Sequence, residues 1–200
     1  MNTPKNNAQY RIIEDSVQIW ESTNIWNFTH IRSNAKIGNN CNIGNNVYID
    51  AWVSIGNNVK IQNTVNVYHG VTIEDDVFVW PSVAFTNDLV PRAFIWWEEK
   101  VTPTLVKKWA SIWSNATIRC WITLWKYCLV WAWSVVTKDV PDHALVIWNP
   151  SRIAALVTQN GNIIKNPHEY VTSKKGSTVE LTFNWENFSV NIWTLQSFVS

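Results

Sequence analysis

The residues that could do chemistry gather at a break in an otherwise regular chain. Thr86, Asn87 and Asp88 come just before the break, and His69 precedes Asn87 by three hexapeptides. An imidazole is poised to gain or lose a proton near pH 7, and its neighbours offer hydroxyl, amide and carboxylate groups. These residue types predict a site of proton transfer and hydrogen bonding beside the break.

The elements that must position this site follow from a repeat of six residues. Every sixth residue from Ile13 to Phe85 is aliphatic or aromatic, and the same spacing resumes from Val106 to Val136. A helix would carry these marker residues around its axis, whereas six is an even number of strand residues, so all of them point to one side. A chain that keeps one side apolar for this long must coil on itself, which indicates a parallel β-helix.

A second column of residues supports this fold. Small or β-branched residues stand four positions after the markers, as Val47, Val53 and Val59 do, and they suit a narrow interior. Turns of a β-sandwich do not recur every six residues, so we do not expect that fold. Three hexapeptides make one triangular turn, so residues that are three hexapeptides apart should stack.

The chain divides into a repeat domain, a loop and a tail. We expect a β-helix domain over residues 8–153, interrupted at residues 86–105 by an external loop that helps to build the site. The periodicity is absent from residues 154–200, which we expect to form a short tail. Within it, the alternating stretch from Thr178 to Phe183 suggests a β-hairpin.

Composition excludes several classes of partner. The formal net charge is +1 without a long run of Lys or Arg, so we expect no nucleic-acid partner. The segment Met1–Arg11 is polar, which predicts neither a signal peptide nor a membrane span. Three cysteines cannot all pair, and Cys41 and Cys128 fall in the interior column. We interpret these two as buried free thiols of a cytoplasmic protein and leave Cys120 unassigned.

The 15 tryptophans stand in unexpected places. Ten of them fall in two columns of the repeat that otherwise hold Gly, Asn or Asp. Those one residue after a marker are Trp20, Trp26, Trp80, Trp113, Trp125 and Trp131, and those three residues after are Trp52, Trp109, Trp121 and Trp133. The second of these columns predicts a corner with positive φ. An aromatic binding surface would be one explanation, but we favour glycine at many of these positions, in a genome that reads one stop codon as glycine.

Three segments of the chain resemble a known family. They are KIQNTVNVYHGVTIEDDVFVWPSVAFTND (60–88), TLVKKWASIWSNATIRCWITL (104–124) and VWAWSVVTKDVPDHALVIWNPSRI (130–153). They resemble hexapeptide acyltransferases with the left-handed parallel β-helix fold. Within that family they are most similar to N-acetyltransferases acting on the 3-amino group of dTDP- or UDP-linked amino sugars. The resemblance spans roughly residues 8–153 and departs from the family where Trp replaces an expected Gly.

The resemblance implies an activity, a co-substrate and an assembly. The implied reaction moves an acetyl group from acetyl-CoA to the amine of a nucleotide sugar, in the synthesis of surface polysaccharide precursors such as O-antigen. The implied assembly is a homotrimer with active sites between subunits, without a metal ion. Left-handed coiling is part of the same implication, since the usual crossover rule gives the opposite hand.

The resemblance also assigns the reacting residues. Asn87 matches the asparagine of the family's FTN motif and is implied to hydrogen-bond the amino group. Glu74, in IEDD, matches an acidic residue near the sugar that could accept hydrogen bonds or assist deprotonation. His69 is either the base or a polar wall of the sugar site. A carboxylate base is not obligatory, because the departing thiolate can take the proton.

Cofactor and substrate contacts follow from the same match. The run VWAWSVVTKDVP corresponds to the family's pantetheine-binding segment, which implies contacts from Ala132 and Ser134. Lys138 and Arg152 would neutralise the CoA phosphates. The sugar-nucleotide contacts expected by position are Gln62, Asn63, Tyr68, His30 and Arg32.

Other functions are compatible with a β-helix. A γ-type carbonic anhydrase needs three histidines around zinc, but the repeats contain only His30 and His69, and these two are not close together in the chain. A non-catalytic β-helix module would need neither the break beside Asn87 nor the cations Lys138 and Arg152. An O-acetyltransferase, or another small-molecule acetyltransferase of this fold, stays open.

Overall fold

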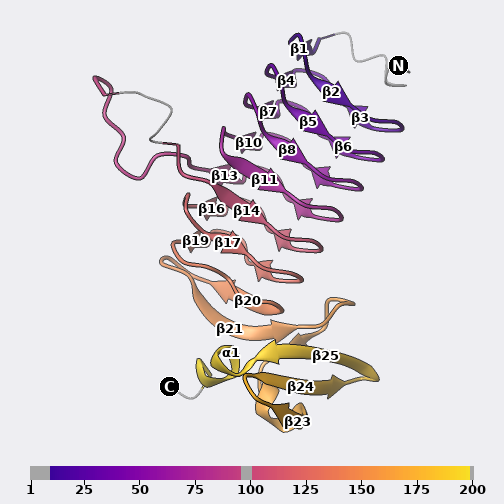
Figure 1. Ribbon diagram of the computed structural model, residues 1–200, viewed down its shortest axis with the longest axis vertical. Helices are drawn as coiled ribbons and strands as arrows, with labels where there is room; N and C mark the ends of the chain where they lie inside the picture. The colour runs from indigo at the N-terminus through magenta and orange to yellow at the C-terminus, as the bar shows by residue number, and fades with distance from the viewer. Residues whose placement is uncertain (1–9, 96–100, 199–200) are drawn as a thin grey trace.

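The computed structural model describes residues 10–95 and 101–198 as a column of stacked coils followed by a small separate sheet (Figure 1). Most strands in the column are two residues long and end on a marker residue, as in β9 (Lys60–Ile61) and β12 (Phe78–Val79). A turn follows each of them, so the chain changes direction after every hexapeptide. The hexapeptide β-helix predicted from the six-residue period is confirmed.

The strands of the column, within the described residues, build three parallel sheets with registers that join residues three hexapeptides apart, such as Ile12 and His30. Sheet 1 consists of β1 (Ile12–Ile13), β4 (His30–Ile31), β7 (Tyr48–Ile49), β10 (Asn66–Val67), β13 (Ala84–Phe85), β16 (Thr117–Ile118) and β19 (Val135–Val136). Sheet 2 consists of β2 (Gln18–Ile19), β5 (Lys36–Ile37), β8 (Ser54–Ile55), β11 (Val71–Ile73), β14 (Thr104–Val106) and β17 (Thr123–Leu124). Sheet 3 consists of β3 (Asn24–Ile25), β6 (Asn42–Ile43), β9, β12, β15 (Ser111–Ile112), β18 (Leu129–Val130) and β20 (Ala144–Ile147), and then the antiparallel β21 (Arg152–Val157) and β22 (Ile163–Ile164).

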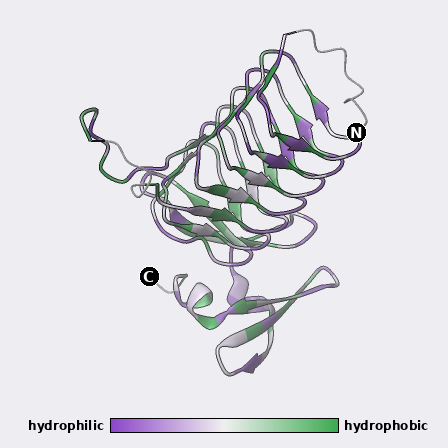
Figure 2. Cartoon of the chain, turned by 45° about the horizontal axis from the view of Figure 1, so that its top comes forward, coloured by the Kyte–Doolittle hydropathy of each residue, from purple (hydrophilic) through white to green (hydrophobic). Residues whose placement is uncertain are grey.

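The marker residues fill the inside of the coils. From Ile25 to Val136 every marker is at most 3% exposed, and the small column between them is buried with them. Ile13 is 37% exposed because no described coil precedes it. Figure 2 shows hydrophobic and hydrophilic residues alternating along the coils, as one inward-facing column requires. Each fully buried aliphatic side chain contributes about 1.5–3 kcal/mol to folding.

The corner column predicted from its Gly, Asn and Asp residues does have positive φ. Asn40, Asn58 and Asp76 lie at φ 57°, 57° and 60°, and Gly70 lies at 91°. Asparagine and aspartate tolerate this conformation better than other side chains do, and glycine adopts it without steric cost. The turns therefore bend sharply at the third position after each marker, which aligns one coil on the next.

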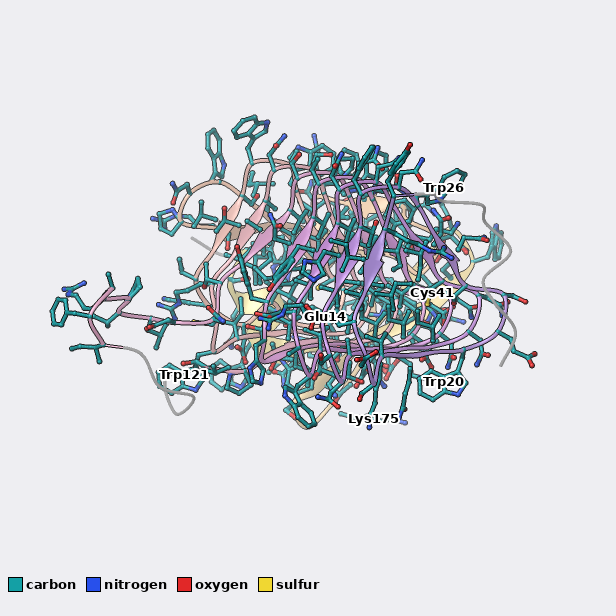
Figure 3. The ribbon with its side chains drawn as sticks, turned by 90° about the horizontal axis from the view of Figure 1, so that it is seen from above. Glu14, Trp20, Trp26, Cys41, Trp121 and Lys175 are labelled. Carbon is teal, nitrogen blue, oxygen red and sulfur yellow. The ribbon has the colours of Figure 1, made fainter. Side chains whose placement is uncertain are left out.

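Three edges of turns run along the column between its sheets. We name them by the sheet that precedes them in the chain, so edge 1 follows sheet 1, edge 2 follows sheet 2 and edge 3 follows sheet 3. Seen down the column, Trp20 on edge 2 and Trp26 on edge 3 point outward in different directions, and Trp121 lies on edge 1 (Figure 3). Successive rungs of a sheet are about 4.8 Å apart, so side chains on one edge form a stack.

The external loop leaves edge 1 after β13 and returns at the start of β14, and it projects from the column (Figure 1). Phe94 and Val90, in its described part, are 84% and 58% exposed. Residues 96–100, also part of the expected loop, lie outside the described residues. The loop thus interrupts the coil at one edge only, the edge that carries Asn87.

The last residues form a compact antiparallel unit below the column. After the 3₁₀ helix Pro167–Tyr170 come β23 (Val171–Lys175), β24 (Thr178–Phe183), β25 (Glu186–Asn191) and the short helix α1 (Ile192–Gln196). The stretch expected to form a hairpin is the central strand β24, which pairs with β23 and β25. The hydrophobic core of this carboxy-terminal unit consists of Leu156, Ile164, Val179, Leu181, Phe188, Val190 and Leu195. No helix of the described residues is long and apolar enough to cross a bilayer.

The three cysteines are buried free thiols. Cys41 and Cys128 lie in the interior, as predicted, and burial raises the pKa of both thiols. Cys120, for which the sequence suggested no role, is also fully buried, but it lies in the turn after β16 on edge 1.

Candidate functional site

Edge 1 brings together the residues expected at the reacting centre. His69 follows β10, Asn87 follows β13, Cys120 follows β16 and Lys138 follows β19, and these strands pair in that order. The turn that carries Asn87 is therefore one rung along the column from the turns of His69 and Cys120, and the turn of Lys138 is one rung beyond that of Cys120. His69 and Asn87 are half-buried, while Lys138 is exposed. The strands that precede the two turns, β10 and β13, are paired, and the stacking of the His69 and Asn87 side chains stays a prediction.

The loop closes back onto this same place. The Thr102 amide donates to the Asn87 carbonyl (2.9 Å), and the Thr104 amide donates to the Gly70 carbonyl (3.0 Å). Below them, the Cys120 amide donates to the Thr86 hydroxyl (2.9 Å). One of these bonds holds the Asn87 carbonyl and another holds the side chain of its neighbour Thr86, so Asn87 stands where the loop is tied to the column.

The amino-terminal part of edge 1 carries a network of charged groups. Glu14 accepts hydrogen bonds from His30 Nε2 (2.8 Å), Arg32 Nε (3.3 Å) and the Ser33 amide (3.0 Å). Arg32 also reaches Asp50 (3.4 Å). His30 in β4 and Arg32 in the turn that follows it, which we expected to contact nucleotide phosphates, are thus each bound to a carboxylate.

These contacts change the ionisation of the network. The Ser33 amide, then His30 and the Ser33 hydroxyl, lower the pKa of Glu14 to about 2. Burial raises the pKa of Tyr48, and contacts to Tyr48, Glu14 and Asp50 raise the pKa of Arg32. Glu14 is therefore ionised and Arg32 charged throughout the ordinary pH range.

Two members of this edge were missed at the sequence level. Asp50 accepts from the Tyr48 hydroxyl (3.2 Å) and from the backbone amide of His69 (3.3 Å), so it helps to position the His69 turn. Glu14 anchors the far end of the network. Counting in steps of three hexapeptides would have found them, because residues 14, 32, 50, 68 and 86 share one position on edge 1. The rings of His30, Tyr48 and Tyr68 also contact in sequence, the first pair edge-to-face and the second tilted, with centroids 5.6 and 5.8 Å apart.

Glu74 lies on edge 2, away from Asn87 in the same chain. It accepts from Lys107 Nζ (2.9 Å) and from the Lys108 amide (3.1 Å), while Lys108 Nζ binds Asp75 (2.7 Å). Burial disfavours the charge of Glu74, but these donors outweigh it and lower the pKa. Within one chain Glu74 acts as an ion-pair partner that joins two coils.

Several other expected contacts also lie away from edge 1. Gln62 and Asn63 stand on edge 3, where the Asn63 side chain accepts from the Asn45 amide (2.8 Å). Ala132 is also on edge 3, in a cavity of about 450 Å³ lined by Trp131, Ala132, Trp133, Ile147, Trp148 and Asn149. Edge 3 therefore holds a separate candidate groove near the carboxy-terminal coils.

The remaining two cofactor candidates differ in their access to a ligand. Ser134 is fully buried in the interior column with its hydroxyl unpaired, and its backbone amide and carbonyl bond to the Trp131 carbonyl (3.3 Å) and the Thr117 amide (2.9 Å). Arg152 is exposed at the start of β21, opposite Ile147 of the edge 3 cavity. Its cation can thus reach an anionic group bound near that cavity. Across residues 10–95 and 101–198, no three His, Cys, Asp or Glu side chains gather as metal ligands would.

A family model for the bacterial transferase hexapeptide (six repeats) matches residues 16–51 and 53–87. A search of curated proteins found no sequence match. The matched residues include most of edge 1, from Arg32 to Asn87. The repeats that position this edge are therefore of the bacterial transferase type.

Solved structures share the architecture. A hexapeptide-repeat acetyltransferase from Vibrio cholerae O1 biovar eltor, complexed with acetyl coenzyme A, is 26% identical with a TM-score of 0.52; the match covers 60% of this chain and 69% of that one. A variant of AntD, an N-acyltransferase from Bacillus cereus in complex with dTDP and coenzyme A, is 18% identical with a TM-score of 0.56, covering 72% and 79%. A variant of the GDP-perosamine N-acetyltransferase from Caulobacter crescentus, in complex with CoA and GDP-perosamine, is 19% identical with a TM-score of 0.50, covering 72% and 56%. This chain thus carries bacterial transferase hexapeptide repeats and has the fold of the hexapeptide-repeat acetyltransferases.

Proposed function

We propose that the protein is an acyltransferase that moves an acetyl group from acetyl-CoA to the 3-amino group of a nucleotide-linked amino sugar. The observation that carries this proposal is edge 1, where Asn87 stands between His69 and Cys120 at the base of the loop. The fold it shares with acetyl-CoA-bound and nucleotide-sugar-bound acyltransferases supports the same chemistry.

The proposed roles follow from what an amine needs in order to attack a thioester. The amine must be neutral and its lone pair must face the carbonyl carbon. The Asn87 amide would accept a hydrogen bond from the amino group and so orient that lone pair. As the new C–N bond forms, the C–S bond breaks and the thiolate leaves. The amine's extra proton passes to His69 or to the thiolate itself.

The co-substrate fits the carboxy-terminal coils on chemical grounds. Acetyl-CoA supplies a thioester at one end and phosphates at the other. We propose that Ala132 and the backbone at Ser134 line the pantetheine arm along edge 3, and that Lys138 and Arg152 pair with the phosphates. Arg32, His30 and Tyr68 would contact the nucleotide sugar from the amino-terminal coils. Lys138 is on edge 1 and Ala132 on edge 3, so one ligand touching both would span two chains.

We therefore also propose a homotrimer with sites between subunits. In such an assembly, edge 1 of one copy faces another edge of the next copy. Edge 2 in that place would bring Glu74 to the substrate, whereas edge 3 would bring Gln62 and Asn63. Light scattering should give three chains per particle. Mixing the inactive variants Asn87→Ala and Glu74→Gln under conditions of subunit exchange should restore part of the activity. A monomer, or no recovery on mixing, contradicts shared sites.

The direct test is acetyl transfer measured as release of free thiol. The protein is incubated with acetyl-CoA and a panel of 3-amino nucleotide sugars, the matching 3-hydroxy sugars, and serine. We expect thiol release and an N-acetylated product with a 3-amino sugar only. Absence of release with every 3-amino sugar refutes the proposal.

O-acetylation is the second candidate, and His69 is the observation that favours it. A hydroxyl, unlike a neutral amine, needs a base to become nucleophilic, and an imidazole one rung from Asn87 could serve. Release with a hydroxyl acceptor, abolished by His69→Gln, would establish this alternative. Retention of most activity in that variant with an amine acceptor would support the first proposal.

A further inference from the structure

Six tryptophans adopt a backbone conformation that a bulky side chain rarely takes. Their φ angles are positive: Trp52 64°, Trp109 63°, Trp121 66°, Trp133 63°, Trp148 82° and Trp185 68°. For a large residue this region is a genuine outlier, because the Cβ atom crowds the backbone. Glycine has no such conflict and is the usual occupant.

The neighbours of these tryptophans in the repeat show what the corner ordinarily holds. At the same position in other coils stand Asn40, Asn46, Asn58, Asp76 and Gly70, all with positive φ. Phe28 and Tyr127 show that an aromatic ring can be held there, at φ 59° and 57°. Single exceptions are tolerated, but four tryptophans in one such column are not a pattern that side-chain preference produces.

Trp185 gives an independent indication outside the repeat. Asn184 and Trp185, at φ 47° and 68°, form the two-residue turn between β24 and β25, whose flanking residues Phe183 and Glu186 pair directly. A hairpin of this length with positive φ at both positions is the type I′ turn, for which Asn-Gly is the strongest sequence preference. The sequence reads Asn-Trp, and the indole is 97% exposed.

Composition points the same way. The chain has 15 Trp and only 6 Gly in 200 residues, whereas Gly is about 7% of average sequences. Converting the six residues to glycine would move the total toward the ordinary value. The same six changes would therefore reduce both the excess of tryptophan and the deficit of glycine.

We infer that Trp52, Trp109, Trp121, Trp133, Trp148 and Trp185 are glycines in the protein as its own cell makes it. The codon at these six positions is decoded as glycine by the translation apparatus of that cell. The inference rests on backbone geometry and is independent of the enzymatic activity. It does not extend to Trp26, whose φ is not positive and whose Nε1 donates to Asn42 (2.9 Å).

The decisive experiment reads the native protein and its gene. Peptides of the protein isolated from its source cells are sequenced by mass spectrometry, and the coding DNA is read at the same positions. We expect glycine in the peptides at all six sites and a codon other than TGG in the DNA. Tryptophan in the peptides at any of the six sites, or TGG there, overturns the inference.

A second experiment tests the geometric argument in the recombinant chain. Trp185→Gly should raise the melting temperature, since it relieves a positive-φ strain and removes no buried contact. Trp193→Gly is the matched control: Trp193 is 71% exposed, but it lies in α1, where glycine weakens the helix and should lower the melting temperature. A fall or no change for Trp185→Gly contradicts the argument.

One consequence deepens the proposed function and depends on it. Trp133 and Trp148 both line the edge 3 cavity beside Ala132, where we place the pantetheine arm. Glycine at both positions would remove two indoles and expose backbone along the groove. The chain carrying Trp133→Gly and Trp148→Gly should bind acetyl-CoA at least tenfold more tightly in calorimetry than the chain with both indoles. Equal affinity refutes this step alone, whereas the peptide masses judge the six glycines and the thiol-release assay judges the activity.

Discussion

At the scale of single residues, the site is a stack of side chains whose backbones are already fixed. Asn87 is braced by Thr102 from the loop and lies between His69 and Cys120, while Asp50 receives the amide of His69. A residue held in this way loses little conformational entropy when a substrate binds. Such a site accelerates the reaction mainly by orienting the reacting groups.

The first prediction concerns Asn87. Asn87→Ala should lower kcat with an amine acceptor by about 100-fold, the usual cost of misplacing a reacting group by an ångström, and should change KM little. Steady-state kinetics with the thiol-release assay measure both constants. Ser173→Ala, an exposed residue of β23 in the carboxy-terminal sheet, is the control and should retain full activity. A rise in KM with unchanged kcat would show that Asn87 only binds.

At the scale of elements, the marker column explains both what the sequence predicts well and what it does not. Ile31, Ile49 and Val67 are fully buried as the period required, and the positive-φ corner follows from Asn and Gly at one offset. That the turns of His69 and Asn87 share edge 1 follows from their spacing of three hexapeptides. The sequence pattern does not show that Cys120 and Lys138 share the edge of Asn87, because the loop breaks the count between Thr86 and Thr104.

Other residues could have been placed better from the sequence alone. Gln62 and Glu74 stand one hexapeptide before and one after Tyr68, so the same arithmetic assigns them to edges 3 and 2 rather than edge 1. The resemblance to the family grouped Gln62 and Glu74 with Asn87 because the three are close in sequence. A sequence motif does not show on which edge of the column each turn lies. The three-stranded sheet of the tail has no repeat, so its pairing order could not be read from periodicity.

The second prediction tests the column. In β8, Ile55 points inward and is 3% exposed, while its neighbour Ser54 points outward. Ile55→Ala should reduce the free energy of unfolding by about 2–5 kcal/mol through lost burial and a cavity. Ser54→Ala should change it by less than about 0.5 kcal/mol. Urea titration of both variants gives the comparison, and similar losses for the two would contradict the inward assignment.

At the scale of the whole molecule, a stack of aromatic rings joins the column to its terminal sheet. His143 is buried, its Nδ1 donates to the Val157 carbonyl (2.8 Å), and its ring stacks between Tyr127 of the column and Phe188 of β25. Burial lowers the pKa of His143, against weaker opposing effects of Val157, Asp142 and Glu186. The junction therefore favours the neutral imidazole.

The third prediction is a loss of stability in mild acid. The unfolded chain binds a proton at His143 near its ordinary pKa of about 6.5, while the folded chain does not until a lower pH. The contribution of His143 to the free energy of unfolding should thus be constant above a pH of about 6.5 and should fall as the pH decreases below it. The melting temperature should therefore be lower at about pH 5.5 than at about pH 7.5. His143→Asn, which tolerates the same positive φ, should show a smaller fall. Equal falls in both proteins would assign the acid sensitivity to other groups.

The register of the coils also limits how such a chain can change in length. Before the loop, each strand of the column pairs with the strand three hexapeptides away. Inserting or deleting three hexapeptides there adds or removes one complete coil and leaves the alignment of the other coils intact. A change of a single hexapeptide would rotate everything downstream by a third of a circuit, moving Lys138 to a different side from His69. The chain can therefore change in length during evolution by complete coils, or by loops that leave the column and return to the same edge. The external loop after Asn87 is a change of the second kind.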